Sequence, residues 1–485
     1  MDKLHWKSAT EIAQAIREKD ISSVEALEHF LERVDRINPD LNAIVWQNRD
    51  GARARAKDAD AALANGESWG PLHGVPFTVK DTLDVAGAPA TWGVPSLKSN
   101  VASTSALAVQ RLEQAGGILF GKTNVPKMLA DWQTYNDVYG LTRNPWNPEL
   151  TPGGSSGGSA AALAAGITGL EAGSDIGGSL RNPAHYCGVF SLKPTWGVIS
   201  PKGHALPGFI DDSDISVIGP MARSAEDLDL ALDVMAGPDD IDGTCWRLDL
   251  PKCEARSFKD LRIAVKLTDP NSEIDGAYAD KLQNLVDELA RRGAQIREVE
   301  PELDTGRMQE IFLMLLRAAT SSRATDADIE KVKEMVHRAD SSQLPYVELI
   351  VKGATLSHRE WLGISNERMH MRRKFNDFFN DWDLVLCPVA ASAAPPHDLQ
   401  GERFQRTVVV NGKPVATTDQ VFWAAYSGML YLPSTIGPAG LTASGLPVGY
   451  QAIAASGHDR WATTFSRMVE REICGFVPPT PLAAS

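Results

Sequence analysis

A chain of 485 residues with 43% apolar and 23% charged residues has the composition of a globular protein that buries a large core. Its net charge of −14 argues against binding to nucleic acid or to an anionic membrane surface, because both attract basic proteins. The five cysteines form no C-x-x-C pair and have no paired histidines, so the sequence indicates neither a disulfide framework nor a zinc site.

No targeting or membrane segment stands out along the chain. Residues 1–20 alternate charged and apolar positions and lack the apolar stretch of a signal peptide. The longest apolar run, around residues 159–165, is well short of the ~18 residues that span a bilayer. Together with the scattered cysteines, these features predict a cytoplasmic protein that does not enter a membrane.

Two amphipathic helices are predicted at the N-terminus. Ser8–Glu11 and Ser22–Glu25 both have the form of a capping box, in which a serine and a glutamate three residues later bind each other's backbone N–H groups. Asn38-Pro39 is expected to end the second helix, because proline lacks the N–H that a helix interior needs. A short strand at residues 43–47 and a charged helix closed by Asn65-Gly66 are expected to follow.

Helices and strands then alternate. The apolar residues 75–79 predict a strand that leads into Lys80 and points this lysine inward, and residues 104–115 and 117–121 predict a helix and a buried strand. This alternation predicts an α/β sheet. We interpret the chain as an α/β fold with a mixed central β-sheet covered by helices on both faces.

The rest of the chain continues this pattern around one long helical stretch. Buried strands are expected at residues 261–266 and 384–387, and residues 304–381 between them are expected to form a helical insertion. The sequence also predicts a helix from Ser224 to about residue 237, a helix followed by a strand over 273–299, a hairpin over 408–415 around Asn411-Gly412, a closing strand over 445–451 and a disordered tail after Phe476. No internal repeat divides the chain, so we interpret residues 1–485 as a single domain.

Two Gly/Ser clusters, GGSSGGS at residues 153–159 and DIGGS at residues 175–179, flank an Ala-rich segment that favours a helix. A flexible linker would be uniformly rich in Gly and Ser, and a phosphate-binding loop would contain G-x-x-x-x-G-K-[ST], which is absent. Residues 153–157 match the G-x-S-x-G of a nucleophile elbow, but that motif must follow a strand. The prolines at positions 145, 148 and 152 exclude a central strand there.

Glycines beside a serine allow its hydroxyl to project from a tight turn, and they can aim consecutive backbone N–H groups at one point. Ser155, Ser156 and Ser179 are therefore candidate nucleophiles or proton carriers. A serine hydroxyl needs a base, and Lys80 is the strongest candidate because burial after an apolar strand would lower its pKa. Asp81 would point to the opposite face if the strand continues. The histidines at positions 185, 204, 337, 358, 370, 397 and 458 stand in no recognisable catalytic context.

At these residues the sequence resembles the amidase signature family of serine hydrolases, through GGSSGGS, GSDIGGSLRNP and CGVFSLKPT. The resemblance extends over about residues 22–472. It implies hydrolysis of carboxylic acid amides without a cofactor or metal, with Ser179 as the nucleophile, Ser155 as the bridging serine after a cis peptide bond, and Lys80 as the terminal base. Ester hydrolysis by the same acyl-enzyme is also implied.

The resemblance further implies the residues around the reacting carbonyl. The backbone N–H groups of Ile176, Gly177, Gly178 and Ser179 would hold the oxyanion, and Asp175 and Arg181 would brace the loop rather than react. Ser156 would support the turn.

The resemblance also implies which residues line the substrate pocket. Met128, Leu129 and Trp132 would line its wall, while Trp423, Tyr426 and Tyr431 are aromatic candidates that could equally lie in the core. These residues predict a small-molecule substrate, an apolar or aryl amide, with aryl carbamates and esters as further candidates. The net charge of −14 predicts no nucleic-acid or membrane partner. The helical insertion would form part of the substrate entrance.

Two other functions are alternatives to amide hydrolysis by this chain alone. The glutaminase component of an aminoacyl-tRNA amidotransferase typically has Y-G-x-V-S-R-Y-G after K-P-T, whereas this chain has WGVISPKG at residues 196–203, and that component needs partner subunits. A binding protein that has lost catalysis would not be expected to keep Lys80, Ser155 and Ser179. A homodimer is left open by the sequence.

Overall fold

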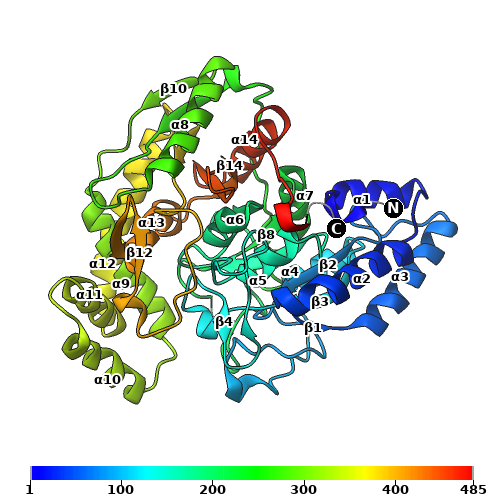
Figure 1. Cartoon of the computed structure of the whole chain (residues 1–485), viewed down its shortest axis with the longest axis horizontal. Helices are drawn as coiled ribbons and strands as arrows, with labels where there is room; N and C mark the ends of the chain where they lie inside the picture. Colours follow the sequence, from blue (N-terminus) through cyan, green and yellow to red (C-terminus); the bar gives the residue numbers. More distant parts are fainter. Residues whose placement is uncertain (1–2, 211, 483–485) are drawn as a thin grey trace.

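The computed structural model describes residues 3–210 and 212–482. Its centre is a single large sheet of eleven strands (Figure 1). In their order across the sheet, the strands are β1 (Ile44–Gln47), β3 (Ile118–Thr123), β2 (Pro76–Lys80), β6 (Glu171–Asp175), β8 (Val217–Ala222), β7 (Phe190–Lys193), β14 (Ser434–Leu441), β15 (Pro447–Ala454), β11 (Leu384–Cys387), β9 (Arg262–Val265) and β10 (Gln295–Glu298). Two small hairpins pair β4 (Tyr135–Asn136) with β5 (Gly140–Leu141) and β12 (Thr407–Val410) with β13 (Lys413–Ala416).

Fourteen α-helices lie within the described residues. They are α1 (Ala9–Arg17), α2 (Ser23–Leu41), α3 (Arg49–Ala64), α4 (Leu107–Gln114), α5 (Gly157–Ala164), α6 (Arg181–Cys187), α7 (Ala225–Met235), α8 (Gly276–Arg291), α9 (Thr305–Ser321), α10 (Asp326–Glu334), α11 (Leu344–Ala354), α12 (His358–Phe378), α13 (Phe422–Gly428) and α14 (Asp459–Glu472). None of them is long and apolar enough to cross a membrane.

The sheet is mixed, as the sequence predicts. β2 runs parallel to β3 and β6, and β9 runs parallel to β10 and β11, whereas the pairs that join these two parts are antiparallel. Helices cover both faces of this sheet and bury apolar clusters against it. The α/β class is therefore confirmed.

The N-terminal helices begin where their capping boxes predict. Ser8 and Ser22 each cap a helix, and the glutamate three residues later binds back to the cap in both cases. The prediction that Asn38-Pro39 ends α2 is wrong by one turn, because Pro39 lies within the final turn. The helix ends at Leu41, and its C-cap Asn42 has a left-handed backbone with φ of 54°.

The helical stretch that the sequence predicts over residues 304–381 is present in the structure. Residues 304–381 contain α9 to α12, which lie far from the N-terminal helices α1 to α3 (Figure 1). That this stretch is an insertion stays a prediction.

The prediction of a disordered tail is wrong for the residues up to Leu482, because the Phe476 ring lies 5.9 Å from the Trp6 ring and Leu482 packs against the N-terminal core. Residues 483–485 lie outside the described residues.

Candidate active site

Lys80 ends β2 in a fully buried position, where it meets the two adjacent serines of the first Gly/Ser cluster, Ser155 and Ser156. Its Nζ lies 2.7 Å from Ser155 Oγ, 2.9 Å from Ser156 Oγ and 3.0 Å from Ser174 Oγ. Within the described residues, the hydrogen-bond partners of this amine are all hydroxyl or carbonyl oxygens. The peptide bond between Gly154 and Ser155 is cis, as the resemblance implies.

This environment changes the proton affinity of the lysine. Burial lowers the pKa of the Lys80 amine from 10.5 to about 7, and three acidic residues nearby offset only part of that shift. A lysine with this pKa is half deprotonated near neutral pH, so its amine is able to accept a proton there.

The neighbouring carboxylate does not neutralise Lys80. The Asp81 carboxylate accepts hydrogen bonds from the Thr91 N–H at 3.0 Å and from the Trp92 N–H at 2.8 Å. These bonds direct Asp81 away from the lysine, in agreement with the strand alternation. Asp81 therefore holds the loop that follows β2.

The second Gly/Ser cluster lies in the tight connection from β6 to α6. Ser179 is 5% exposed, and its carbonyl oxygen accepts a hydrogen bond of 3.2 Å from the Ser156 N–H, which joins the two clusters. Among the described residues, no hydrogen bond links the Ser155 and Ser179 hydroxyls. Catalytic hydrogen bonds are often long before substrate binds, so this geometry is compatible with a relay.

The backbone amides of this loop differ in their availability. Asp175 Oδ1 accepts a hydrogen bond of 2.9 Å from the Gly178 N–H, so this N–H is engaged within the loop, and the role of Gly178 in holding an oxyanion stays a prediction. The N–H groups of Ile176, Gly177 and Ser179 have no acceptor within residues 3–210 and 212–482. Three of the four expected donors thus remain available.

Trp132 and Leu316 lie against the glycines of this loop. Trp132 Nε1 donates a hydrogen bond of 2.9 Å to the Gly177 carbonyl, and a Cβ added to Gly178, whose φ is +101°, would lie 2.7 Å from the Trp132 ring. On α9, Leu316 Cδ2 lies 3.5 Å from the Cβ position of Gly177. Glycine is therefore required at position 178 by both conformation and space.

The pocket-wall candidates Met128 and Leu129 lie in a short 3-10 turn, η3 (Lys127–Leu129). Both have left-handed backbone conformations, with φ of 54° and 57°. The Met128 N–H donates a hydrogen bond of 2.8 Å to the Trp92 carbonyl oxygen, and Met128 is exposed while Leu129 is partly buried. Leu129 remains a candidate for substrate contact.

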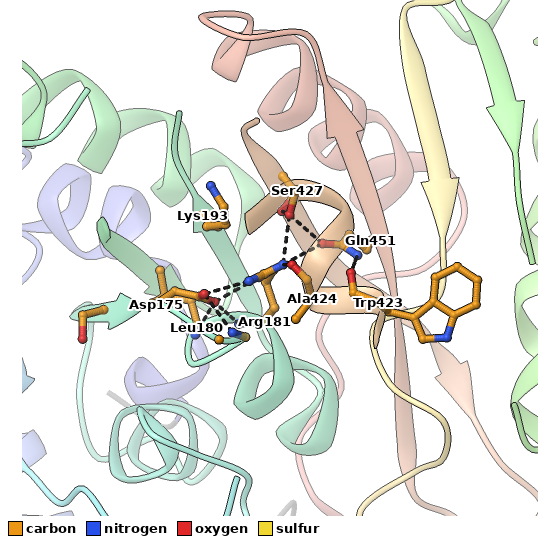
Figure 2. Close-up of polar contacts among 12 residues, drawn as sticks. Asp175, Leu180, Arg181, Lys193, Trp423, Ala424, Ser427 and Gln451 are labelled. Carbon is orange, nitrogen blue, oxygen red and sulfur yellow. Dashed lines mark hydrogen bonds and ion pairs between the residues drawn. The ribbon is translucent and has the colours of Figure 1, made fainter. Parts of the chain in front are cut away.

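The three aromatic candidates from the C-terminal region divide into two groups. Trp423 and Tyr426, on α13, are fully buried, and the Trp423 indole points away from Arg181 (Figure 2), so both belong to the core. Tyr431 is partly buried between the Trp196 ring, whose centroid is 4.8 Å away, and the guanidinium of Arg368 at 4.6 Å. None of the three has a described contact with Ser179.

A buried polar network lies behind the loop that carries Ser179. Arg181 donates to Asp175, to the Ala424 carbonyl at 2.7 Å and to Ser427 Oγ at 2.9 Å (Figure 2). Gln451 on β15 extends the network, because its Oε1 accepts from Ser427 Oγ at 3.0 Å. The family resemblance implies a bracing role for Asp175 and Arg181, whereas Ser427 and Gln451 are unexpected members of this network because no local motif marks them.

Other titratable groups lie nearby without reaching the serines. Lys193 is buried and burial lowers its pKa to about 7, but its Nζ donates to the Pro194 carbonyl at 2.8 Å. His185 is hydrogen-bonded to the Ser392 carbonyl and the Gly449 N–H. Within the described residues, no three His, Cys, Asp or Glu side chains are placed to hold a metal ion.

Known proteins resemble this chain along most of its length. The family named Amidase matches residues 25–461. The chain is 34% identical to an indoleacetamide hydrolase from Bradyrhizobium diazoefficiens, over 92% of this chain and 83% of that protein. It is 35% identical to an acylamidase from Rhodococcus erythropolis, over 94% of this chain and 93% of that protein. Glutamyl-tRNA(Gln) amidotransferase components are also similar, and one from a Synechococcus species is 32% identical, with 91% of each chain covered.

Solved structures extend the similarity to the fold. A bacterial aryl acylamidase described as one of the amidase signature enzymes matches with a TM-score of 0.80 at 26% identity, over 96% of both chains. The sequence and structural similarities indicate the same family as the two Gly/Ser clusters and Lys80 do. The chain belongs to the amidase signature family and is an amidase, a hydrolase that acts on amide bonds.

Proposed function

We propose that this amidase works through an acyl-enzyme on Ser179, with Ser155 carrying the proton between Ser179 and Lys80. The observation that supports this proposal most directly is the 2.7 Å distance from Lys80 Nζ to Ser155 Oγ in a site without a carboxylate partner for the amine among the described residues. A buried lysine of this kind accepts a proton near neutral pH, which a serine nucleophile requires.

The reaction would proceed in two halves. Ser179 Oγ attacks the amide carbon while its proton passes to Ser155 Oγ, and the Ser155 proton passes to Lys80 Nζ. The N–H groups of Ile176, Gly177 and Ser179 stabilise the oxyanion. The C–N bond then breaks as the amine receives a proton through the same relay, and water attacks the remaining ester in the second half.

Apolar or aryl amides are the proposed substrates, with aryl carbamates and esters as further ones. Trp132 and Leu316 beside the Gly177–Gly178 backbone would give the acyl or amine group an apolar surface, and Leu129 is a further candidate for this surface. The similarity to an indoleacetamide hydrolase and to an aryl acylamidase supports the same substrate class.

The test is turnover of a panel by the purified single chain, with products identified by mass spectrometry. We expect hydrolysis of indoleacetamide and of a 4-nitroanilide, and slower release of ammonia from glutamine. Turnover of glutamine above both would instead favour the glutaminase component of an aminoacyl-tRNA amidotransferase. Failure on every amide, with no covalent labelling of Ser179 by a fluorophosphonate, would refute the proposal.

A further inference from the structure

Two arginines and a tyrosine from three separate elements meet beside the catalytic loop. Arg317 lies on α9, Tyr346 on α11 and Arg403 on the 3-10 turn η7 (Arg403–Gln405). Arg403 Nη2 donates a hydrogen bond of 2.8 Å to the Tyr346 hydroxyl, and Arg403 Nη1 donates one of 3.1 Å to the Ala130 carbonyl. All three side chains are partly buried, so this cluster is neither in the core nor fully solvated.

The cluster has an excess of positive charge. Within the described residues, neither Arg317 nor Arg403 forms an ion pair, and Arg317 Nε is buried without a hydrogen-bond partner. The nearby Asp131 carboxylate is held at 2.7 Å by a third arginine, Arg406. Guanidinium groups that are partly withdrawn from water without a counter-charge are unfavourable, so this arrangement favours the binding of an anion.

The positive charge of the two arginines also changes the pKa of Tyr346. Burial acts to raise the pKa of the Tyr346 phenol, but the guanidiniums of Arg403 and Arg317 together hold that pKa below its usual value. The hydroxyl is therefore a strong hydrogen-bond donor toward an anion.

Two chain segments connect this cluster to the catalytic loop. Leu316, which precedes Arg317, has its side chain 3.5 Å from the Cβ position of Gly177. Ala130, which accepts from Arg403, is two residues before Trp132, and the Trp132 indole donates to the Gly177 carbonyl. The cluster thus lies just beyond the apolar residues that border the proposed carbonyl site.

We propose that Arg317, Arg403 and Tyr346 form a subsite for a carboxylate on the substrate, so that this amidase prefers amides with an anionic group beyond their apolar or aryl part. The planar forks of two arginines suit the two oxygens of a carboxylate, and the phenol supplies a further donor. This inference rests on the proposed amide hydrolysis at Ser179.

The test compares two 4-nitroanilides of similar acyl length, glutaryl with a free carboxylate and pentanoyl without one. We expect the wild-type protein to have a kcat/KM roughly 10- to 100-fold higher for the glutaryl substrate, the usual contribution of charged hydrogen bonds. Arg317→Gln and Arg403→Gln should each abolish most of that preference through KM, and Arg403→Lys should restore part of it. Arg307→Gln is the matched control, because Arg307 lies on the same helix but pairs with Glu310 and Glu367.

The outcomes separate this inference from the proposed function. The preference is a ratio measured within each variant, so a partial loss of folded protein does not change it. Equal turnover of both anilides by the wild-type protein, or a preference that survives both glutamine variants, would overturn the carboxylate subsite while amide hydrolysis stands. No turnover of either anilide would count against the proposed function itself.

Discussion

Arg181 and Asp175 form an ion pair in which Nη2 lies 2.7 Å from Oδ1 and both side chains are 1% exposed. The same guanidinium binds the Ala424 carbonyl and Ser427 of α13 (Figure 2). The pair therefore connects the loop that carries Ser179 to an element more than 240 residues away in sequence.

Replacing this arginine should destabilise the protein strongly. Arg181→Met leaves the Asp175 carboxylate buried without its counter-charge, which typically costs about 3–5 kcal/mol of folding free energy. Urea unfolding would measure the change. Arg307→Met, which removes a partly exposed pair, should cost no more than about 1 kcal/mol. Equal losses in the two variants would show that the burial of the Arg181 pair has no special weight.

The pH dependence of catalysis should report Lys80. Its neutral amine is the proposed base, so kcat/KM should be constant above an apparent pKa of about 7 and fall tenfold per unit below it. Lys80→Met should reduce kcat by several orders of magnitude. Lys193→Met is the matched control, since Lys193 is equally buried but binds a carbonyl. A folded Lys80→Met variant with near-normal turnover would exclude the lysine as the base.

Ser155 and Ser156, the two adjacent serines that contact Lys80, should differ in their effect on rate. Ser155→Ala should lower kcat by roughly 10²–10⁴, the usual contribution of proton transfer, with little change in substrate affinity. Ser156→Ala should have a smaller effect, because Ser156 Oγ donates to the Ser174 carbonyl at 3.2 Å and supports the turn. Ser179→Ala should abolish fluorophosphonate labelling. The reverse order for the first two variants would assign the relay to Ser156.

Glu171 should be a neutral acid in the folded protein. It is fully buried, Thr78 Oγ1 donates to its Oε1 at 2.5 Å, and its Oε2 has no partner among the described residues. Burial raises the pKa of this carboxyl to about 8. A carboxyl that is protonated when folded but ionised when unfolded lowers stability as pH rises, by about 1.4 kcal/mol per unit between the two pKa values.

Glu171→Gln tests this assignment. Relative to the glutamine variant, the wild-type protein should lose free energy of unfolding from about pH 4.5 to about pH 8, as measured by denaturant titration across that range. The acid limb of kcat/KM should not move, since no charge is removed beside Lys80. A shift of that limb to lower pH would mean that Glu171 is ionised in the wild-type protein.

Much of the local structure follows from short sequence patterns. The capping boxes at Ser8 and Ser22 and the hairpin at Asn411-Gly412 depend on residues within one turn of each other, so the sequence is sufficient to predict them. The local sequence is also sufficient to predict that Lys80 lies at the end of a buried strand and that the two Gly/Ser clusters form tight turns. These patterns predicted the α/β fold, and the family resemblance that they carry implied that Lys80 lies beside Ser155.

Only the tertiary structure decided which groups around Lys80 and the two Gly/Ser clusters are buried, which are charged, and which are free to form a hydrogen bond with a substrate. Asp175 withdraws the Gly178 amide through a bond within the loop whose geometry Arg181 and α13 help to fix. Burial on all sides raises the pKa of the Glu171 carboxyl, and the meeting of α9, α11 and η7 brings Arg317 next to Arg403. Desolvation and charge depend on every neighbour of a side chain, and most of those neighbours are distant in sequence, so no local pattern encodes them.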